Sequence, residues 1–183
     1  MVRKLEKKDL LKNVVKHIDI KKYDSTEIID AMREMSFTSR DTARAADILM
    51  MMVKEKQCTN ILTLAGSTSA AGCMQVYVDM VRNKMIDVVV STGASVIDMD
   101  LFEALGFKHY IGEKENVVPD TKLRELYIDR IYDTYIDEEQ LQVCDHATYE
   151  LANILEPRPY SSREFLWNLG KWLHEGHGVK KDS

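Results

Sequence analysis

The sequence has little cysteine, proline or glycine: only three cysteines, three prolines and eight glycines occur among its 183 residues. An odd number of cysteines without metal-ligand spacing argues against a disulfide framework or a zinc site, and it favours a reducing compartment. We expect Cys58 and Cys73 to be small core residues. The scarcity of proline and glycine, with 45% hydrophobic and 30% charged residues, is typical of an ordered, helix-rich globular domain rather than a linker.

Long apolar runs and an excess of positive charge are also missing. The amino terminus, MVRKLEKKDLLKNVVKHIDI, has basic residues but no continuous apolar core, so it predicts neither a signal peptide nor a membrane span. A formal net charge of −5 argues against non-specific nucleic-acid binding and permits a basic partner such as a polyamine. We therefore expect a cytoplasmic protein that binds neither membranes nor nucleic acid.

Recognisable catalytic and metal-binding groupings are absent as well. The five histidines are scattered, and the one close pair, His174 and His177, has no acidic third ligand nearby, so we expect no metal site. No G-x-S-x-G elbow and no Ser/His/Asp or Cys/His grouping indicates a nucleophile. The acidic run Asp137-Glu138-Glu139 is typical of a helix start, with an acid–base site as the alternative.

The stretch from Asn60 to Asp100 is the most informative part of the chain. Two short runs rich in Ile, Leu and Val, Asn60–Ala65 and Ile86–Ser91, are typical of parallel strands buried on both faces. The segment between them predicts the crossover helix of a β-α-β unit. In that helix, over Ala70–Lys84, we expect three apolar side chains to face the sheet and three charged ones to face solvent: Met74, Val78 and Val81 inward, Asp79, Arg82 and Lys84 outward.

Each of these two strands is followed by a loop of small residues. Gly66–Ser69 follows the first and Thr92–Ser95 the second, so the loops should be neighbours at the edge where open α/β sheets bind ligands. Small residues let backbone N–H groups approach a phosphate, although the regular G-x-G-x-x-G fingerprint is absent and a tight turn is the alternative. Asp98 and Asp100 follow at once; they could accept hydrogen bonds from ribose hydroxyls, pair with an amine, or simply stabilise a helix start.

The rest of the chain is predicted to be mostly helical. We expect residues 1–22 to form an extended arm that packs on a neighbour, ahead of a cofactor-binding portion over residues 23–183. Capping patterns and helical stripes predict one helix over Ser25–Met35 and a second that follows a cap in Ser36–Asp41 and ends at about Lys56. Further helices are expected over Asp98–Leu105, in two segments between Lys122 and Leu155, and from Ser161 to Trp172. A strand is expected at Phe107–Gly112 and a loop at Glu113–Thr121. Three strands at most make a poor open sheet, so we expect further sequence or another chain to complete it.

Three segments resemble the amino-terminal half of the deoxyhypusine synthase family. The most specific is ILTLAGSTSAAGCMQVYVDMVRNKMIDVVVSTGASVIDMDLFEALGFKHYIG, supported by DRIYDTYIDEEQLQVCDHATYELANIL and SSREFLWNLGKWL. The resemblance runs from about Tyr23 to the last residue. It implies a Rossmann-like parallel α/β sheet covered by helices, in a tetramer-like assembly of dimers with active sites at subunit interfaces.

The resemblance also implies an NAD-dependent transfer reaction. NAD oxidises spermidine, the aminobutyl group passes to an enzyme lysine as an imine and then to a lysine in the precursor of the hypusine-containing translation factor, and the imine is reduced. The family's two nucleotide loops and the acids after them, matched with a one-residue shift at the acids, fall on ten residues that are expected to bind the cofactor: Gly66, Ser67, Thr68, Ser69, Thr92, Gly93, Ala94, Ser95, Asp98 and Asp100.

Members of that family are about twice as long, and their imine-forming lysine lies in the other half. Lys180 and Lys181 match nothing in the family's catalytic motif, so no catalytic residue is expected in this chain. We expect a partner chain with the carboxyl-terminal half to complete the sheet and to supply the lysine; a processed precursor or a shortened sequence are the alternatives. The functional alternatives are a homospermidine synthase-like enzyme that uses a small diamine as acceptor, and a non-catalytic regulatory subunit.

Overall fold

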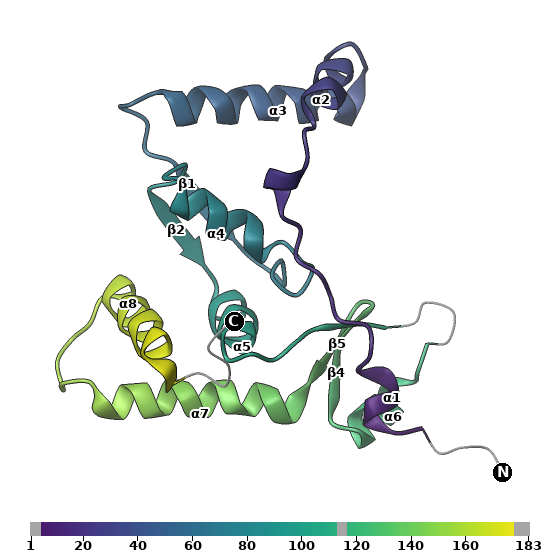
Figure 1. Ribbon diagram of the computed structural model, residues 1–183, viewed down its shortest axis with the longest axis vertical. Coiled ribbons are helices and arrows are strands. Elements are labelled where there is room, and N and C mark those ends of the chain that lie inside the picture. The colour runs from purple at the N-terminus through teal and green to yellow at the C-terminus, as the bar shows by residue number, and fades with distance from the viewer. Residues whose placement is uncertain (1–4, 113–116, 178–183) are drawn as a thin grey trace. The chain divides into compact units, whose positions relative to one another are not determined.

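The computed structural model describes residues 5–112 and 117–177, and the chain divides into two compact units. The first unit consists of Met1–Lys16, Ala65–Ala71 and Thr92–Ser183, and the second of His17–Leu64 and Gly72–Ser91. Figure 1 labels the α-helices of both and the strands β1, β2, β4 and β5. In the described ranges, no helix combines the length and the apolarity needed to cross a membrane.

The second unit contains the predicted β-α-β arrangement. Strands β1 (Ile61–Leu64) and β2 (Val88–Ser91) pair in parallel, with Ile61 opposite Val88, and helix α4 (Met74–Arg82) connects them. Both strands start at the same point because the Asn60 N–H donates to the Asp87 carboxylate (2.8 Å) and the Asn60 carbonyl accepts from the Asp87 N–H (2.9 Å).

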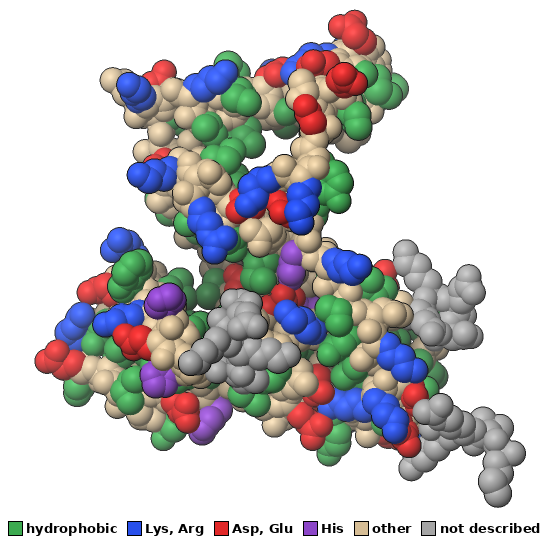
Figure 2. All heavy atoms as spheres, viewed as in Figure 1, with side chains coloured by type: hydrophobic (Ala, Val, Ile, Leu, Met, Phe, Trp, Pro, Cys, Tyr) green, Lys and Arg blue, Asp and Glu red, His purple; other side chains and the backbone are tan. Residues whose placement is uncertain are grey.

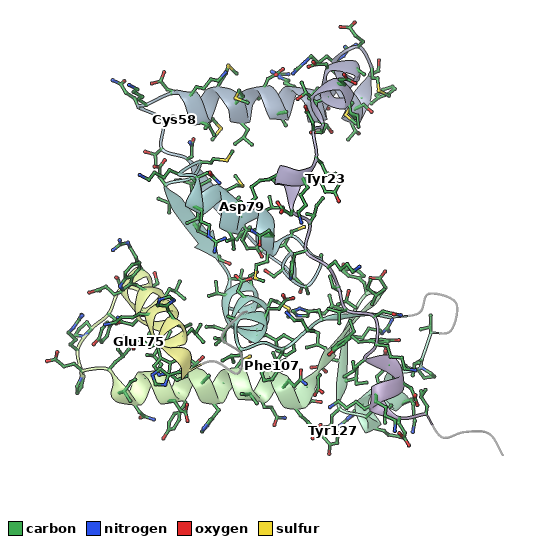
Figure 3. All side chains as sticks on the ribbon, in the orientation of Figure 1. Tyr23, Cys58, Asp79, Phe107, Tyr127 and Glu175 are labelled. Carbon is green, nitrogen blue, oxygen red and sulfur yellow. The ribbon has the colours of Figure 1, made fainter. Side chains whose placement is uncertain are left out.

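Burial of these strands on both faces, predicted from their apolar composition, is wrong for the chain as it stands. Exposed fractions are 56% for Ile61, 41% for Val88 and 55% for Val90. A sheet of two strands gives each face too few neighbours to cover it. The charged side of α4 also differs from the prediction, because Asp79 is only 4% exposed and accepts a hydrogen bond from Lys21 Nζ at 2.9 Å (Figure 3).

A helical hairpin precedes the strands in the second unit. Helices α2 (Thr26–Arg33) and α3 (Phe37–Lys54) confirm the two helices expected there, and a short 3-10 turn, η1 (Ile20–Lys22), lies before them. The Asp24 carboxylate accepts from the Thr26 N–H at 2.9 Å, which fixes the start of α2.

The first unit contains an antiparallel sheet that the sequence did not predict. Strand β5 (Thr134–Asp137) lies between β3 (Tyr110–Ile111) and β4 (Ile128–Ile131). The expected strand at Phe107–Gly112 therefore exists in shortened form, but it does not extend the parallel sheet. The helix expected from Lys122 onward is wrong beyond α6 (Asp120–Glu125), since a β-hairpin follows.

Part of the amino-terminal arm packs on the first unit. Helix α1 (Lys7–Leu10) places Lys7 Nζ 2.6 Å from Asp137 and 2.7 Å from Glu139. Further along the arm, Val14 forms an isolated antiparallel β-bridge with Tyr110. The boundary at residue 22 stays a prediction.

The core of the first unit lies between three helical segments. The π-helix η2 (Ala94–Leu101) continues into α5 (Phe102–Ala104), and both pack against α7 (Glu138–Ile154) and α8 (Ser162–Trp172), which ends in the kinked segment η3 (Leu173–His177). Phe102 and Cys144, both 0% exposed, are the most deeply buried members. Ala70, 1% exposed, belongs to the same cluster and anchors the loop before it. The chain is thus α/β as predicted, while a Rossmann-like sheet and its completion by a second polypeptide stay predictions.

Candidate functional site

The two loops of small residues lie in the first unit, and a hydrogen bond joins them. Ser95 Oγ donates to the Gly66 carbonyl at 2.7 Å and lies 3.2 Å from Thr92 Oγ1. The Ser95 N–H donates to the Thr92 carbonyl at 3.1 Å, which turns the second loop into η2. Ser95 is 1% exposed, so its hydroxyl is a fixed structural part of both loops.

The first loop is also held from its other end. Ser69 is fully buried, and its hydroxyl donates to the Asp100 carboxylate of η2. The Ala71 N–H donates to the Ser67 carbonyl at 3.0 Å, closing a turn around Thr68. The Asp100 carboxylate thus holds the first loop in place, and it already accepts a hydrogen bond from the protein.

We call the two loops, Gly66–Ser69 and Thr92–Ser95, the cradle. Several of its polar groups could still form hydrogen bonds with a ligand. In the described part of the chain, the N–H groups of Gly66, Ser67 and Thr68 donate to no protein acceptor. Thr68 Oγ1 is buried and has no hydrogen-bond partner there either. Gly66 has φ +73°, and a side chain at Gly66 or Gly93 would meet open space.

These features fit a phosphate-bearing cofactor. Backbone N–H groups beside small residues are the usual donors to such groups, and an orphaned buried hydroxyl is uncommon without a ligand. The two open glycines leave room for a ligand at the backbone.

Asp98 differs from Asp100 in making no hydrogen bond or ion pair within the described ranges, and it is half-buried. Burial, and then the negative charge of Asp145, raises its pKa above the usual value. A carboxylate in this state gains from a hydroxyl or an ammonium group that approaches it.

The sequence offered no signal for the neighbours of Asp98 on α7. Burial, with smaller contributions from Asp145 and Asp98, raises the pKa of the Cys144 thiol to about 12. Cys144 is therefore an inert thiol below the acids. Cys73 is exposed and Cys58 half-buried, so the expectation that both are core residues is wrong for Cys73.

The other candidates have structural roles. Asp137 caps α7, accepting from the N–H groups of Glu139 (3.0 Å) and Gln140 (3.3 Å), which confirms the helix start. His177 stacks on Trp172 with ring centroids 5.0 Å apart. Lys180 and Lys181 lie outside the described residues.

A buried pair that the sequence did not reveal joins α5 to the segment that follows it. His109 Nδ1 lies 2.6 Å from Glu103 Oε1, and the two residues are 0% and 4% exposed. The His109 ring also packs on Phe102, with centroids 4.9 Å apart. This pair fixes the segment after η2 to the core.

Comparison with known proteins gives a consistent result. The family model described as "DS: Deoxyhypusine synthase" matches residues 27–183. The chain is 63% identical to a deoxyhypusine synthase-like protein of Caulobacter vibrioides over 97% of this chain and 48% of that protein, and 59% identical to one of Coxiella burnetii over 97% and 50%. A probable deoxyhypusine synthase 2 of Methanosarcina acetivorans is 37% identical over 91% and 47%. The chain spans about half the length of the curated relatives it matches.

Proposed function

Because this chain belongs to the deoxyhypusine synthase family, we propose that it forms the NAD-binding part of a transferase that moves the aminobutyl group of spermidine. The observation that carries the proposal is the bond from Ser95 to the Gly66 carbonyl, which makes one cradle of two loops. The donors left over in that cradle are those a dinucleotide needs. When bound, NAD would accept the hydride from the polyamine.

We assign a binding role to each group according to the hydrogen bonds that it can still form. The N–H groups of Gly66, Ser67 and Thr68, with the Thr68 hydroxyl, hold the cofactor phosphates. Asp98 receives ribose hydroxyls or a substrate ammonium group, whereas Asp100 keeps the first loop in place through Ser69. Ser95 positions both loops and does not itself touch the ligand.

The lysine that carries the aminobutyl group would come from outside this sequence. The curated relatives are about twice as long as the chain, which leaves room for a segment that bears it. We propose that this carboxyl-terminal half, as a partner chain, completes the active site, within an assembly that contains further copies. The intact mass of whatever co-purifies with the chain tests this, and transferase activity of the isolated chain would refute it.

The leading acceptor is a lysine of the precursor of the hypusine-containing translation factor. A small diamine is the alternative, and one observation favours keeping it. The relatives that are 50–63% identical are named deoxyhypusine synthase-like proteins, whereas the one named a probable deoxyhypusine synthase is 37% identical. Labelled spermidine with NAD separates the two, because the label ends in protein in one case and in a polyamine in the other.

The cofactor site is tested by Asp98→Asn in the assembled enzyme. Loss of the carboxylate should weaken NAD binding, measured by titration calorimetry, by about tenfold or more, since hydrogen bonds to a charged group contribute about 1.5–3 kcal/mol. Asp41→Asn, at an exposed position on α3, is the matched control and should bind normally. Unchanged affinity in the Asp98 variant would favour a regulatory subunit instead.

A further inference from the structure

The surface around α8 carries two adjoining hollows that the cofactor site does not use. The first, about 300 Å³, is lined by Arg158, Arg163, Glu164, Trp167 and Asn168. The second, about 410 Å³, is lined by residues from the end of α7, the following loop and α8: Ala152, Asn153, Leu155, Glu156, Pro157, Arg158, Tyr160 and Phe165. We call the two together the α8 groove. Arg158 lines both hollows, so they lie on either side of this one residue.

Arg158 is held in a fixed orientation at this junction. Its guanidinium lies 3.8 Å above the centre of the Tyr160 ring, and it donates to the Pro159 carbonyl at 2.8 Å. A second contact, from the terminal nitrogens to Glu164 Oε1, measures 3.3–3.4 Å. Because a planar guanidinium has five N–H donors, it can still bind an incoming carboxylate from this position.

The one acid in the first hollow is already neutralised. Glu164 Oε2 accepts from the Ser161 N–H and hydroxyl, both at 2.9 Å, while Oε1 faces Arg158. These contacts, first the Ser161 backbone, then its hydroxyl and Arg158, hold the pKa of Glu164 below its usual range. Two arginines and one glutamate leave the hollow positively charged.

Arg163 and Trp167 provide the exposed part of the groove. They stand one helical turn apart on α8, and Trp167 is 73% exposed. In the described ranges Arg163 makes no hydrogen bond or ion pair. Figure 2 shows basic and hydrophobic side chains beside one another over α8. Exposed Trp and Arg side by side are the composition of protein interface hot spots.

We infer that the α8 groove binds a segment of a partner protein that carries acidic side chains and apolar side chains such as leucine. The first hollow, with Arg158 and Arg163 against the one paired Glu164, favours carboxylates there, whereas Glu156 balances the charge of Arg158 in the second hollow. The second hollow, with Leu155, Pro157 and Phe165 among its lining residues, calls for an apolar side chain next to these carboxylates. Two hollows that share Arg158 suit an extended segment of several residues better than one compact molecule. This inference is independent of the proposed NAD site.

The test uses the full chain with its co-purifying partners and a fluorescein-labelled peptide of alternating glutamate and leucine. Fluorescence anisotropy should report saturable binding, and a lysine–leucine peptide of the same length should not bind. Arg163→Glu and Trp167→Ala should each weaken binding by at least about tenfold, the range of interface hot spots. Matched controls are Arg44→Glu on α3 and the 63% exposed Tyr149→Ala on α7, which should bind as the unaltered protein does.

Three outcomes would overturn the inference. Equal binding of both peptides would indicate non-specific apolar contact. Equal loss in the Arg163 and Arg44 variants would indicate a bulk charge effect. Full competition by inorganic phosphate at matched ionic strength would indicate a simple anion site. Circular dichroism of each variant separates loss of binding from loss of folding.

Discussion

Replacing Ser95 by alanine removes the hydroxyl that joins the two loops of the cofactor cradle. Ser95 is 1% exposed, and its Oγ donates to the Gly66 carbonyl at 2.7 Å. A hydrogen bond of this kind contributes about 0.5–1.5 kcal/mol. Gly66 is exposed, so its carbonyl can return to water, and we expect a loss of about 1 kcal/mol. For a chain of this size that lowers the melting temperature by about 2–4 °C in differential scanning calorimetry.

The effect on cofactor binding should exceed the effect on stability. Without the hydroxyl, the first loop must be ordered when NAD binds, and fixing the backbone of one residue costs about 1–2 kcal/mol. Affinity should therefore fall roughly five- to thirtyfold. Titration calorimetry of the assembled enzyme measures this change.

A matched variant separates the two effects. Thr42→Ala removes a hydroxyl of α3, in the second unit, that donates to the Thr38 carbonyl at 2.8 Å. It should leave NAD affinity unchanged. If the Ser95 variant melts at a lower temperature but binds NAD as tightly as the unaltered protein, the positioning role assigned to Ser95 is wrong.

Three further experiments test other parts of the chain. Glu103→Ala leaves the fully buried His109 without its partner and should lower the free energy of unfolding by about 2–3 kcal/mol in urea titrations; a loss below about 0.5 kcal/mol would contradict the pairing. Native alkylation at pH 8 should modify Cys73, which is exposed, and spare Cys144, whose pKa is about 12; peptide mass spectrometry with Cys144 modified would refute this. Ser161→Ala removes the cap of α8 and should cost about 1 kcal/mol in thermal unfolding, so an unchanged melting temperature would argue against the cap.

Features written in neighbouring residues could be predicted from the sequence. The sequence predicts helices α2, α3, α7 and α8 correctly because their apolar stripes are local features, and α7 and α8 also have capping residues next to their first turns. The parallel pairing of β1 and β2 also followed from a local pattern of strand, helix and strand. The adjacency of the small-residue loops is a consequence of that pairing.

Features that depend on distant residues could not be predicted. The sequence predicts Asp79 to be exposed to solvent. Asp79 is buried because it forms an ion pair with Lys21, which is far away in the chain. The β4–β5 hairpin was missed because its apolar spacing also fits a helix. Its turn gave no warning either, since Tyr132 adopts φ +54° where glycine or asparagine is the usual signal.

The difference between Asp98 and Asp100 also depends on distant residues. Ser69 binds Asp100, whereas Asp98 faces the negative charge of Asp145 on another helix. Both acids look alike in the sequence, and only their tertiary contacts distinguish them.

The π-helical winding of η2 determines how this segment can change in length over evolution. Ala94–Leu101 closes each turn with one residue more than an α-helix does, so the segment holds a residue that an α-helical version would lack. Deleting one residue here would let the backbone rewind as an α-helix, in which each residue advances by about 100°. Acids on one side of the deletion would then rotate against those on the other. A relative with an α-helix here would therefore align with a one-residue gap, and it would have to recruit an acid from a different position.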